Sequence, residues 1–142
     1  MLETIHSREE LLKLNKDQDA ALCEEIRAFL VENLSHTGGH LASNLGIVET
    51  TLAIHKVFDT RVDRLVFDVG HQSYVHKLLT GRMDGFAGLR TYGGMSGFPK
   101  PSESEQDAFI AGHASNAVSV ALGMARARTL QKKTYNVIAL LG

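Results

Sequence analysis

Histidine follows glycine at three places in this chain, and these places are the first candidates for chemistry. They lie at residues 39–40, 70–71 and 112–113. An imidazole with an unperturbed pKa near 6.5 can accept or donate a proton at neutral pH. A neighbouring glycine lets the backbone approach a ligand closely. Each pair is also compatible with a simple turn that holds a hydrogen-bonded histidine, so the pattern alone leaves both interpretations open.

Alternating helices and strands are predicted to position these segments. Apolar periodicity predicts helices over residues 17–36, 48–58, 73–80 and 116–130, and a capping-box pattern at Ser7 and Glu10 predicts a short helix before them. Short apolar runs at 64–68 and 135–141 predict buried strands. This alternation predicts an α/β fold with a parallel sheet flanked by helices. The glycine-rich segment 81–104 is long enough to predict a functional or mobile loop.

The carboxyl ends of the predicted strands are the expected ligand site, as in other open α/β sheets. Residues 68–71 follow the first strand, and residues 111–115 precede the alanine-rich helix. A small-residue loop that opens a helix presents free N–H groups to phosphate oxygens. At residues 38–46, one interpretation places His40 at the mouth of a cleft as a proton donor or acceptor. The other is a turn in which Gly38 and Gly39 end one helix and Ser43 caps the next.

Composition argues against several classes of function. The chain has 142 residues, and its 15 Lys and Arg balance 16 Asp and Glu, so no strong field points to nucleic acid or an anionic membrane. We therefore expect no nucleic-acid partner. We also expect no membrane partner, because no apolar run has the length of a membrane span. A single cysteine, Cys23, and an acidic N-terminus without an apolar segment predict a reducing, cytoplasmic location.

Metal and dinucleotide sites are not favoured by the spacing. His36 and His40 are four apart but separated by two glycines, and His71 and His76 are five apart. Neither a cysteine pair nor a His-Glu-x-x-His pattern occurs in the sequence. The glycines at 93–97 lack the strand and helix that a dinucleotide fingerprint needs. Cys23 and His55 lie near apolar helix faces, which favours structural roles for both.

The combination of motifs resembles one enzyme family. In order, these are residues 38–46 (GGHLASNLG), 67–77 (FDVGHQSYVHK), 79–82, 93–99 (GGMSGFP), 102–107 and 112–115. They resemble the 1-deoxy-D-xylulose-5-phosphate synthases, which are transketolase-like, thiamine-diphosphate-dependent enzymes, from about residue 19 to residue 142. Some members carry histidine where Ser96 stands, so that position receives no role. The resemblance implies decarboxylation of pyruvate and transfer of its two-carbon unit to D-glyceraldehyde 3-phosphate, toward isoprenoid, thiamine and pyridoxal precursors.

The resemblance also assigns residues. His40 matches the family's catalytic histidine, and His71 matches a histidine that contacts thiamine diphosphate. Gly112, His113 and Ala114 match the cofactor-binding loop. In the family, a Gly-Asp-Gly motif that supplies a Mg²⁺ ligand follows the position of Gly142, so we expect no metal ligand within this chain.

The resemblance implies that residues 1–142 are the N-terminal part of the diphosphate-binding domain of a longer, homodimeric enzyme. The chain stops within an apolar run, which fits this expectation. By itself the chain is then expected to bind the cofactor negligibly and to be inactive. Two alternatives remain at this point. One is the N-terminal piece of a transketolase, and the other is a non-catalytic α/β binding module derived from such a domain.

Overall fold

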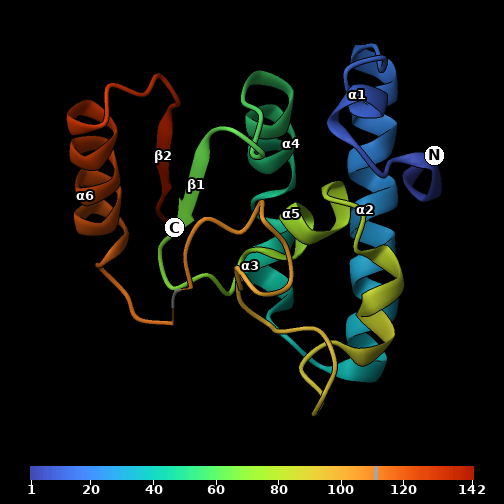
Figure 1. The fold of residues 1–142 in the computed structure, drawn as a ribbon. Helices are drawn as coiled ribbons and strands as arrows, with labels where there is room; N and C mark the ends of the chain where they lie inside the picture. Colours follow the sequence, from blue (N-terminus) through green and yellow to red (C-terminus); the bar gives the residue numbers. More distant parts are fainter. Residues whose placement is uncertain (111) are drawn as a thin grey trace.

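A computed structural model describes residues 1–110 and 112–142, which form helices around a small parallel sheet (Figure 1). The elements in chain order are η1 (Leu2–Thr4), α1 (Arg8–Leu11), α2 (Lys16–Thr37), α3 (Leu41–Leu45), α4 (Val48–Val57), β1 (Arg64–Phe67), α5 (Tyr74–Leu79), η2 (Met83–Gly88), α6 (Ala117–Leu130) and β2 (Val137–Leu140). The predicted α/β class is confirmed.

The two strands pair in parallel, in the register that sets Arg64 opposite Val137 and Phe67 opposite Leu140. Parallel neighbours require a crossover connection, and here that connection runs through α5, η2 and α6. Figure 1 shows α6 on one face of the strands and α4 and α5 on the other. Both strands end at the same edge of the sheet, so the segments that follow them begin side by side.

Helix α2 begins and ends where its sequence directs. The Asn15 side chain accepts the Gln18 N–H at 3.0 Å, and the Gln18 side chain accepts the Asn15 N–H at 2.9 Å. Together they form a capping box. The helix ends at Gly38, which has a φ of 71°. The apolar periodicity that predicts this helix is a stripe of Leu22, Ile26, Phe29, Leu30 and Leu34. The stripe is confirmed, since all of these except the partly buried Phe29 are buried.

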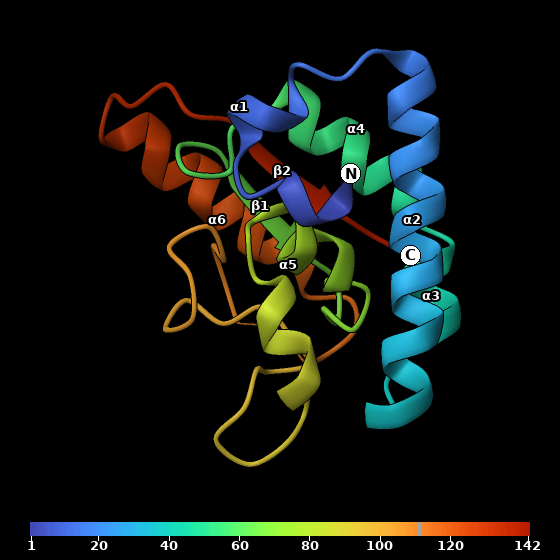
Figure 2. The ribbon, with the colours of Figure 1, turned by 90° about the vertical axis from the view of Figure 1, so that its right-hand side faces the viewer.

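Helix α5 is the centre of the fold, and all six of its residues are buried. It lies between the sheet and α2 (Figures 1 and 2). Two of its side chains, His76 and Lys77, are basic. Buried ionisable groups must be paired or neutral, because an isolated charge in the interior is costly. The neighbours of α5 therefore have to supply polar partners.

Residues 38–46 differ from the turn proposed above. They contain the short helix α3, with His40 as its N-cap residue. Ser43 lies inside α3, and its hydroxyl donates to the His40 carbonyl, so the expected cap of α4 by Ser43 is wrong. Gly38 does end α2 as predicted. Five residues are too few to show a helical period in sequence, which explains why α3 was missed.

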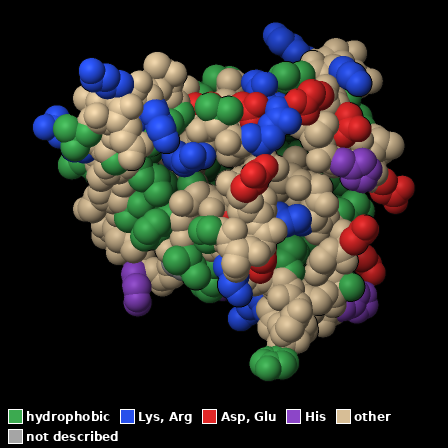
Figure 3. Space-filling view, in the orientation of Figure 1, with side chains coloured by type: hydrophobic (Ala, Val, Ile, Leu, Met, Phe, Trp, Pro, Cys, Tyr) green, Lys and Arg blue, Asp and Glu red, His purple; other side chains and the backbone are tan. Residues whose placement is uncertain are grey.

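The glycine-rich segment 81–104 contains η2. After η2 the chain runs below α3 in the view of Figure 1 and then returns toward the strands. On the other side, apolar side chains are open to solvent over α6 and the strands (Figure 3). The exposed apolar residues of this face are Val118, Leu122, Leu130 and Leu141. Among the described residues, no helix combines the length and the hydropathy that crossing a membrane would require.

Candidate functional site

His40 and His71 lie together at the carboxyl-terminal end of β1. His40 precedes α3, and His71 follows the tight turn of Val69 and Gly70, both of which have positive φ. The two imidazole rings meet edge to face, with centroids 5.1 Å apart and planes at 70°. The structure thus brings together two of the three glycine–histidine pairs, from segments about 30 residues apart in the chain.

The backbone before His40 is held against Tyr74. Gly39 has a φ of 143°, and a Cβ built on it would lie 3.1 Å from the Tyr74 hydroxyl and 3.2 Å from Leu34. The Tyr74 hydroxyl accepts the His40 N–H at 3.4 Å. Glycine is needed at residue 39 for both its conformation and its close contact with Tyr74. This contact fixes where His40 enters the site.

The environment of His40 favours its neutral form. Partial burial lowers the pKa of His40, and the neighbouring His71 and Arg90 lower it further. A neutral imidazole carries one unprotonated ring nitrogen and can accept a proton at neutral pH. His40 nevertheless remains exposed, so a substrate can reach it. Its position and charge suit acid–base chemistry.

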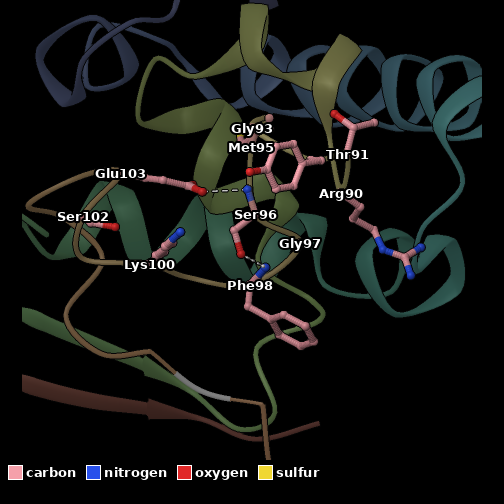
Figure 4. Close-up of a pocket in the computed structure, with 12 residues that line it drawn as sticks. Arg90, Thr91, Gly93, Met95, Ser96, Gly97, Phe98, Lys100, Ser102 and Glu103 are labelled. Carbon is pink, nitrogen blue, oxygen red and sulfur yellow. Dashed lines mark hydrogen bonds between the residues drawn. The ribbon is translucent and has the colours of Figure 1, made fainter.

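Arg90, whose charge acts on His40, lines a pocket of about 640 Å³ (Figure 4). The wall of the pocket includes residues 96–98, and Gly97 is so close to Arg90 that a Cβ would lie 2.9 Å from the Arg90 Cγ. The Ser96 N–H donates to Glu103 at 2.6 Å, and the Phe98 N–H donates to the Ser96 hydroxyl at 3.2 Å (Figure 4). The pocket wall is therefore fixed by hydrogen bonds within the glycine-rich segment.

The loop before α6 is tied to Asp68. The Asp68 carboxylate accepts the Ser115 N–H at 3.0 Å and the Ala117 N–H at 3.2 Å, and these bonds lower the pKa of Asp68. The expectation that the N–H groups at this helix start are free is therefore wrong for Ser115 and Ala117. Gly112, His113 and Ala114 precede them and are exposed. Ala111, which the sequence analysis included in this loop, lies outside the described residues.

Unpaired polar atoms gather at the same end of the sheet. His71 Nδ1, Gln72 Oε1 and Asn116 Oδ1 are buried atoms without a hydrogen-bond partner among the described residues. His71 and Gln72 also line a hollow of about 200 Å³ that reaches Gly142. Buried polar atoms are normally paired, so these three are available to a water molecule or to a polar ligand.

A second histidine pair lies inside the fold. His55 Nε2 is 2.9 Å from His76 Nδ1, and His76 Nε2 is 2.9 Å from the Asp107 carboxylate. Arg82 donates two hydrogen bonds to Asp107, at 2.7 and 2.8 Å. Burial is the largest influence on both histidines and lowers the pKa of each. His55 is buried, which agrees with the structural role expected for it. Its network links α4 and α5 to Asp107, which follows the glycine-rich segment.

The remaining candidates have structural positions. His36 is exposed near the end of α2 and pairs with Glu32, apart from His40. Cys23 is buried, and burial raises the pKa of its thiol, so little of the reactive thiolate forms. Within residues 1–110 and 112–142, no three His, Cys, Asp or Glu side chains gather in a way that could hold a metal ion.

Sequence reasoning missed several residues that shape the site. Asn44 and Tyr74 stand inside quoted motifs but received no role, and Arg90 was not singled out. The glycine-rich segment contains both Arg82 and Arg90, so residue type alone does not single out Arg90. The contacts of Asn44 and Tyr74 join segments about 30 residues apart, and no local pattern carries that information.

The fold is an α/β domain, and its candidate ligand site lies at the carboxyl ends of parallel strands. A family model described as 1-deoxy-D-xylulose-5-phosphate synthase matches residues 2–142. The chain therefore belongs to the 1-deoxy-D-xylulose-5-phosphate synthase family.

Individual relatives agree with this assignment. The chain is 56% identical to a 1-deoxy-D-xylulose-5-phosphate synthase of Alkaliphilus oremlandii over 99% of its length, and this match covers 23% of the relative. It is also 56% identical over its whole length to the corresponding synthases of Geobacter sulfurreducens and Cytophaga hutchinsonii, covering 22% of each. The chain thus spans less than a quarter of the length of these curated relatives.

Proposed function

We propose that this chain supplies part of the cofactor site of an enzyme that condenses pyruvate with D-glyceraldehyde 3-phosphate and releases CO₂. In this proposal the whole protein is a thiamine-diphosphate-dependent transferase in isoprenoid and thiamine precursor synthesis. The observation that carries the proposal is the pairing of His40 and His71 at the carboxyl end of β1, in a chain that belongs to this synthase family.

The residues present fit thiamine diphosphate at this edge of the sheet. The unpaired atoms His71 Nδ1, Gln72 Oε1 and Asn116 Oδ1 are available to a polar ligand. In our proposal His71 contacts the cofactor, and the exposed loop of Gly112, His113 and Ala114 lies against it. The bound cofactor supplies stabilisation of a carbanion, and the protein supplies orientation and proton transfer.

His40 is the proposed acid–base group. Its lowered pKa keeps the imidazole neutral at neutral pH, so a ring nitrogen is free to accept a proton from a substrate hydroxyl. Arg90 adds a fixed positive charge in the adjoining pocket, where an anionic substrate group is favoured. His40 therefore combines access to substrate with the correct protonation state.

Mg²⁺ is part of the proposal for the whole protein, with ligands outside this chain. Diphosphate oxygens usually share Mg²⁺ with one or two protein carboxylates. We further propose that the isolated 142-residue chain binds the cofactor negligibly and is inactive. Isothermal calorimetry tests this directly, because Mg²⁺-dependent micromolar binding by the isolated chain would contradict it.

The whole protein is proposed to be a cytoplasmic homodimer. The open apolar residues of α6, Val118 and Leu122 among them, support burial of this face in a larger assembly. Sedimentation of the whole protein measures its mass in solution. A mass equal to one chain would contradict the homodimer.

The activity itself is tested by an assay of the whole protein with pyruvate and D-glyceraldehyde 3-phosphate. CO₂ release and the five-carbon product are measured with and without thiamine diphosphate and Mg²⁺. The matched comparison replaces pyruvate with a ketose phosphate donor, which a transketolase would use. We expect turnover with pyruvate alone as donor, and preference for the ketose phosphate would contradict the proposal.

A further inference from the structure

Asn44 lies between the two histidines of the candidate site, on helix α3, and is completely buried. Its side-chain Nδ2 donates to the His40 carbonyl at 2.6 Å and to the His71 carbonyl at 2.9 Å. Its Oδ1 accepts the Tyr74 N–H at 2.9 Å. One carboxamide therefore joins the backbone of both histidines and the start of α5.

The chemistry of these three bonds requires an amide. A carboxamide offers two N–H donors and an acceptor oxygen, which matches two carbonyls and one N–H. A carboxylate of the same shape has only acceptors and would set an oxygen against two carbonyl oxygens. An alanine would remove this partner from the His40 and His71 carbonyls and from the Tyr74 N–H, and polar groups that are buried without a partner destabilise the fold.

The same contacts set the geometry of the rings. The segment that carries His40 is held by Asn44 at its carbonyl and by the Tyr74 hydroxyl at its N–H. The segment that carries His71 is held by Asn44 at its carbonyl. Because both histidines depend on one buried side chain, a change at residue 44 moves them relative to each other. The 5.1 Å separation of their rings is the measurable consequence.

We propose that Asn44 is a positioning residue that fixes the spacing of the His40 and His71 imidazoles. The effect on turnover rests on the proposed function, but the effect on spacing does not. Asn44 touches neither substrate nor cofactor in this proposal and acts only through the backbone of the two histidines. Misplacing catalytic groups by about 1 Å can lower a rate by about 10²-fold.

The test uses Asn44→Asp in the whole protein, with Asn44→Ala as a second variant that brings no charge into the site. Asn33→Ala is the matched control, because the Asn33 side chain donates to the Phe29 carbonyl within α2, away from the site. A crystal structure gives the His40–His71 ring separation, and steady-state kinetics with pyruvate and D-glyceraldehyde 3-phosphate give kcat and KM. Thermal unfolding shows whether each variant is folded.

We expect the ring separation to change in both Asn44 variants and kcat to fall about 10- to 100-fold, with a smaller change in KM. The pH profile gives a readout that loss of stability would not move. The buried carboxyl group that Asn44→Asp introduces faces the His40 and His71 carbonyls and the Tyr74 N–H. The titratable and charged groups of the site are the two imidazoles and Arg90, whose charge acts on His40. The carboxyl group can donate to one carbonyl only when protonated. The ratio of Asn44→Asp to wild-type kcat should therefore rise as pH falls from about 8 to about 6.

The outcomes separate the two proposals. Unchanged ring positions in a folded Asn44 variant overturn the positioning role, whatever the activity. If the wild-type protein lacks the synthase activity, the proposed function fails, while the crystal structures still decide the role of Asn44. A lower unfolding temperature with an unchanged ring separation and an unchanged pH profile would show that Asn44 serves only stability.

Discussion

Two histidine pairs with nearly equal ring separations lie in this chain, and their surroundings indicate different roles. The ring centroids are 5.1 Å apart for His40 and His71 and 5.0 Å apart for His55 and His76. In the first pair His40 is exposed and His71 is half-buried, whereas His55 and His76 are only 3% and 1% exposed. Residue type and spacing therefore do not distinguish a candidate catalytic pair from a structural one. Burial and hydrogen-bond partners do.

The buried pair is satisfied while both of its histidines are neutral. His55 can donate its Nε2 proton to His76 Nδ1, and His76 can then donate its Nε2 proton to Asp107. Burial acts to raise the pKa of Asp107, but hydrogen bonds from His76 and Arg82 outweigh burial and hold it well below its usual value. The single charge of Asp107 is thus matched by Arg82. Within residues 1–110 and 112–142, the His71 Nδ1 atom has no hydrogen-bond partner, so it is available to a ligand.

The largest expected effect comes from breaking the buried network at Asp107. Asp107→Ala removes the partner of both His76 and Arg82 and also the acceptor of the Lys100 N–H. Loss of one partner of a buried ion pair costs about 3–5 kcal/mol of folding free energy. Chemical denaturation measures this loss. Glu105→Ala is the matched control, because Glu105 is exposed and its loss should change the free energy of unfolding by no more than about 0.5 kcal/mol. An equal effect of both substitutions would contradict the network.

His40→Ala breaks the other pair, and its effect should appear in turnover. We expect kcat to fall at least about 10²-fold, as on loss of a general acid–base group, with little change in the free energy of unfolding. His76→Ala should give the opposite pattern, with a large loss of stability. Turnover of a folded His40→Ala protein at the wild-type rate would leave His40 as a turn residue only.

Gly39→Ala tests how the backbone holds His40. A side chain at a φ of 143°, with its Cβ 3.1 Å from the Tyr74 hydroxyl, should cost about 1–3 kcal/mol of stability and displace His40. Gly123→Ala in α6 is the control, because that glycine has open space around it and a helical alanine is favoured by about 0.5–1 kcal/mol. Calorimetry measures the stability of both variants, and steady-state kinetics measure their kcat. Equal stability of the two would contradict the account.

The pH dependence of stability should report the buried pair. The folded-state pKa values of His55 and His76 lie below their unfolded value, so the unfolded chain binds more protons below about pH 6.5. Their contribution is present above that pH and is lost as pH falls, by up to about 1.4 kcal/mol per pH unit for each histidine. Denaturation between about pH 7 and pH 5 measures the slope, which should shrink in His55→Gln. Stability that rises on acidification would contradict a neutral pair.

The smallest effect is expected at His36, which serves as a baseline for both pairs. This exposed residue pairs only with Glu32, one turn earlier in α2. Exposed ion pairs contribute about 0–1 kcal/mol, so His36→Ala should change neither the unfolding midpoint nor kcat appreciably. A large loss of either would show that exposure and partners do not separate the roles of the histidines.

The sequence was sufficient for the parts of the fold that local patterns determine. The Ser7–Glu10 capping box forms, with the Ser7 N–H donating to Glu10 at 3.0 Å, and the stripe of α2 packs as predicted. Both strands form at the predicted places, within a residue or two of the expected ends.

The sequence was insufficient where residues far apart in the chain form hydrogen bonds or ion pairs with each other. Asp107 and His76 are 31 residues apart, and Asn44 and Tyr74 are 30 apart, so no periodicity predicts either contact. The short helix α3 and the use of Asp68 by the start of α6 also depend on tertiary packing. For the candidate site, the motifs predicted roles for His40 and His71, and only the structure showed that their rings lie together.

The central claim is that the edge of the sheet carrying His71 and residues 112–114 receives thiamine diphosphate, with His40 facing the substrate side. A crystal structure of the whole protein with thiamine diphosphate and Mg²⁺ tests it most directly. We predict a ring nitrogen of His71 and the backbone of Gly112–Ala114 within hydrogen-bond distance of the cofactor, and the His40 imidazole beside the open face of its reactive centre. A cofactor bound away from His71 and this loop would contradict the account.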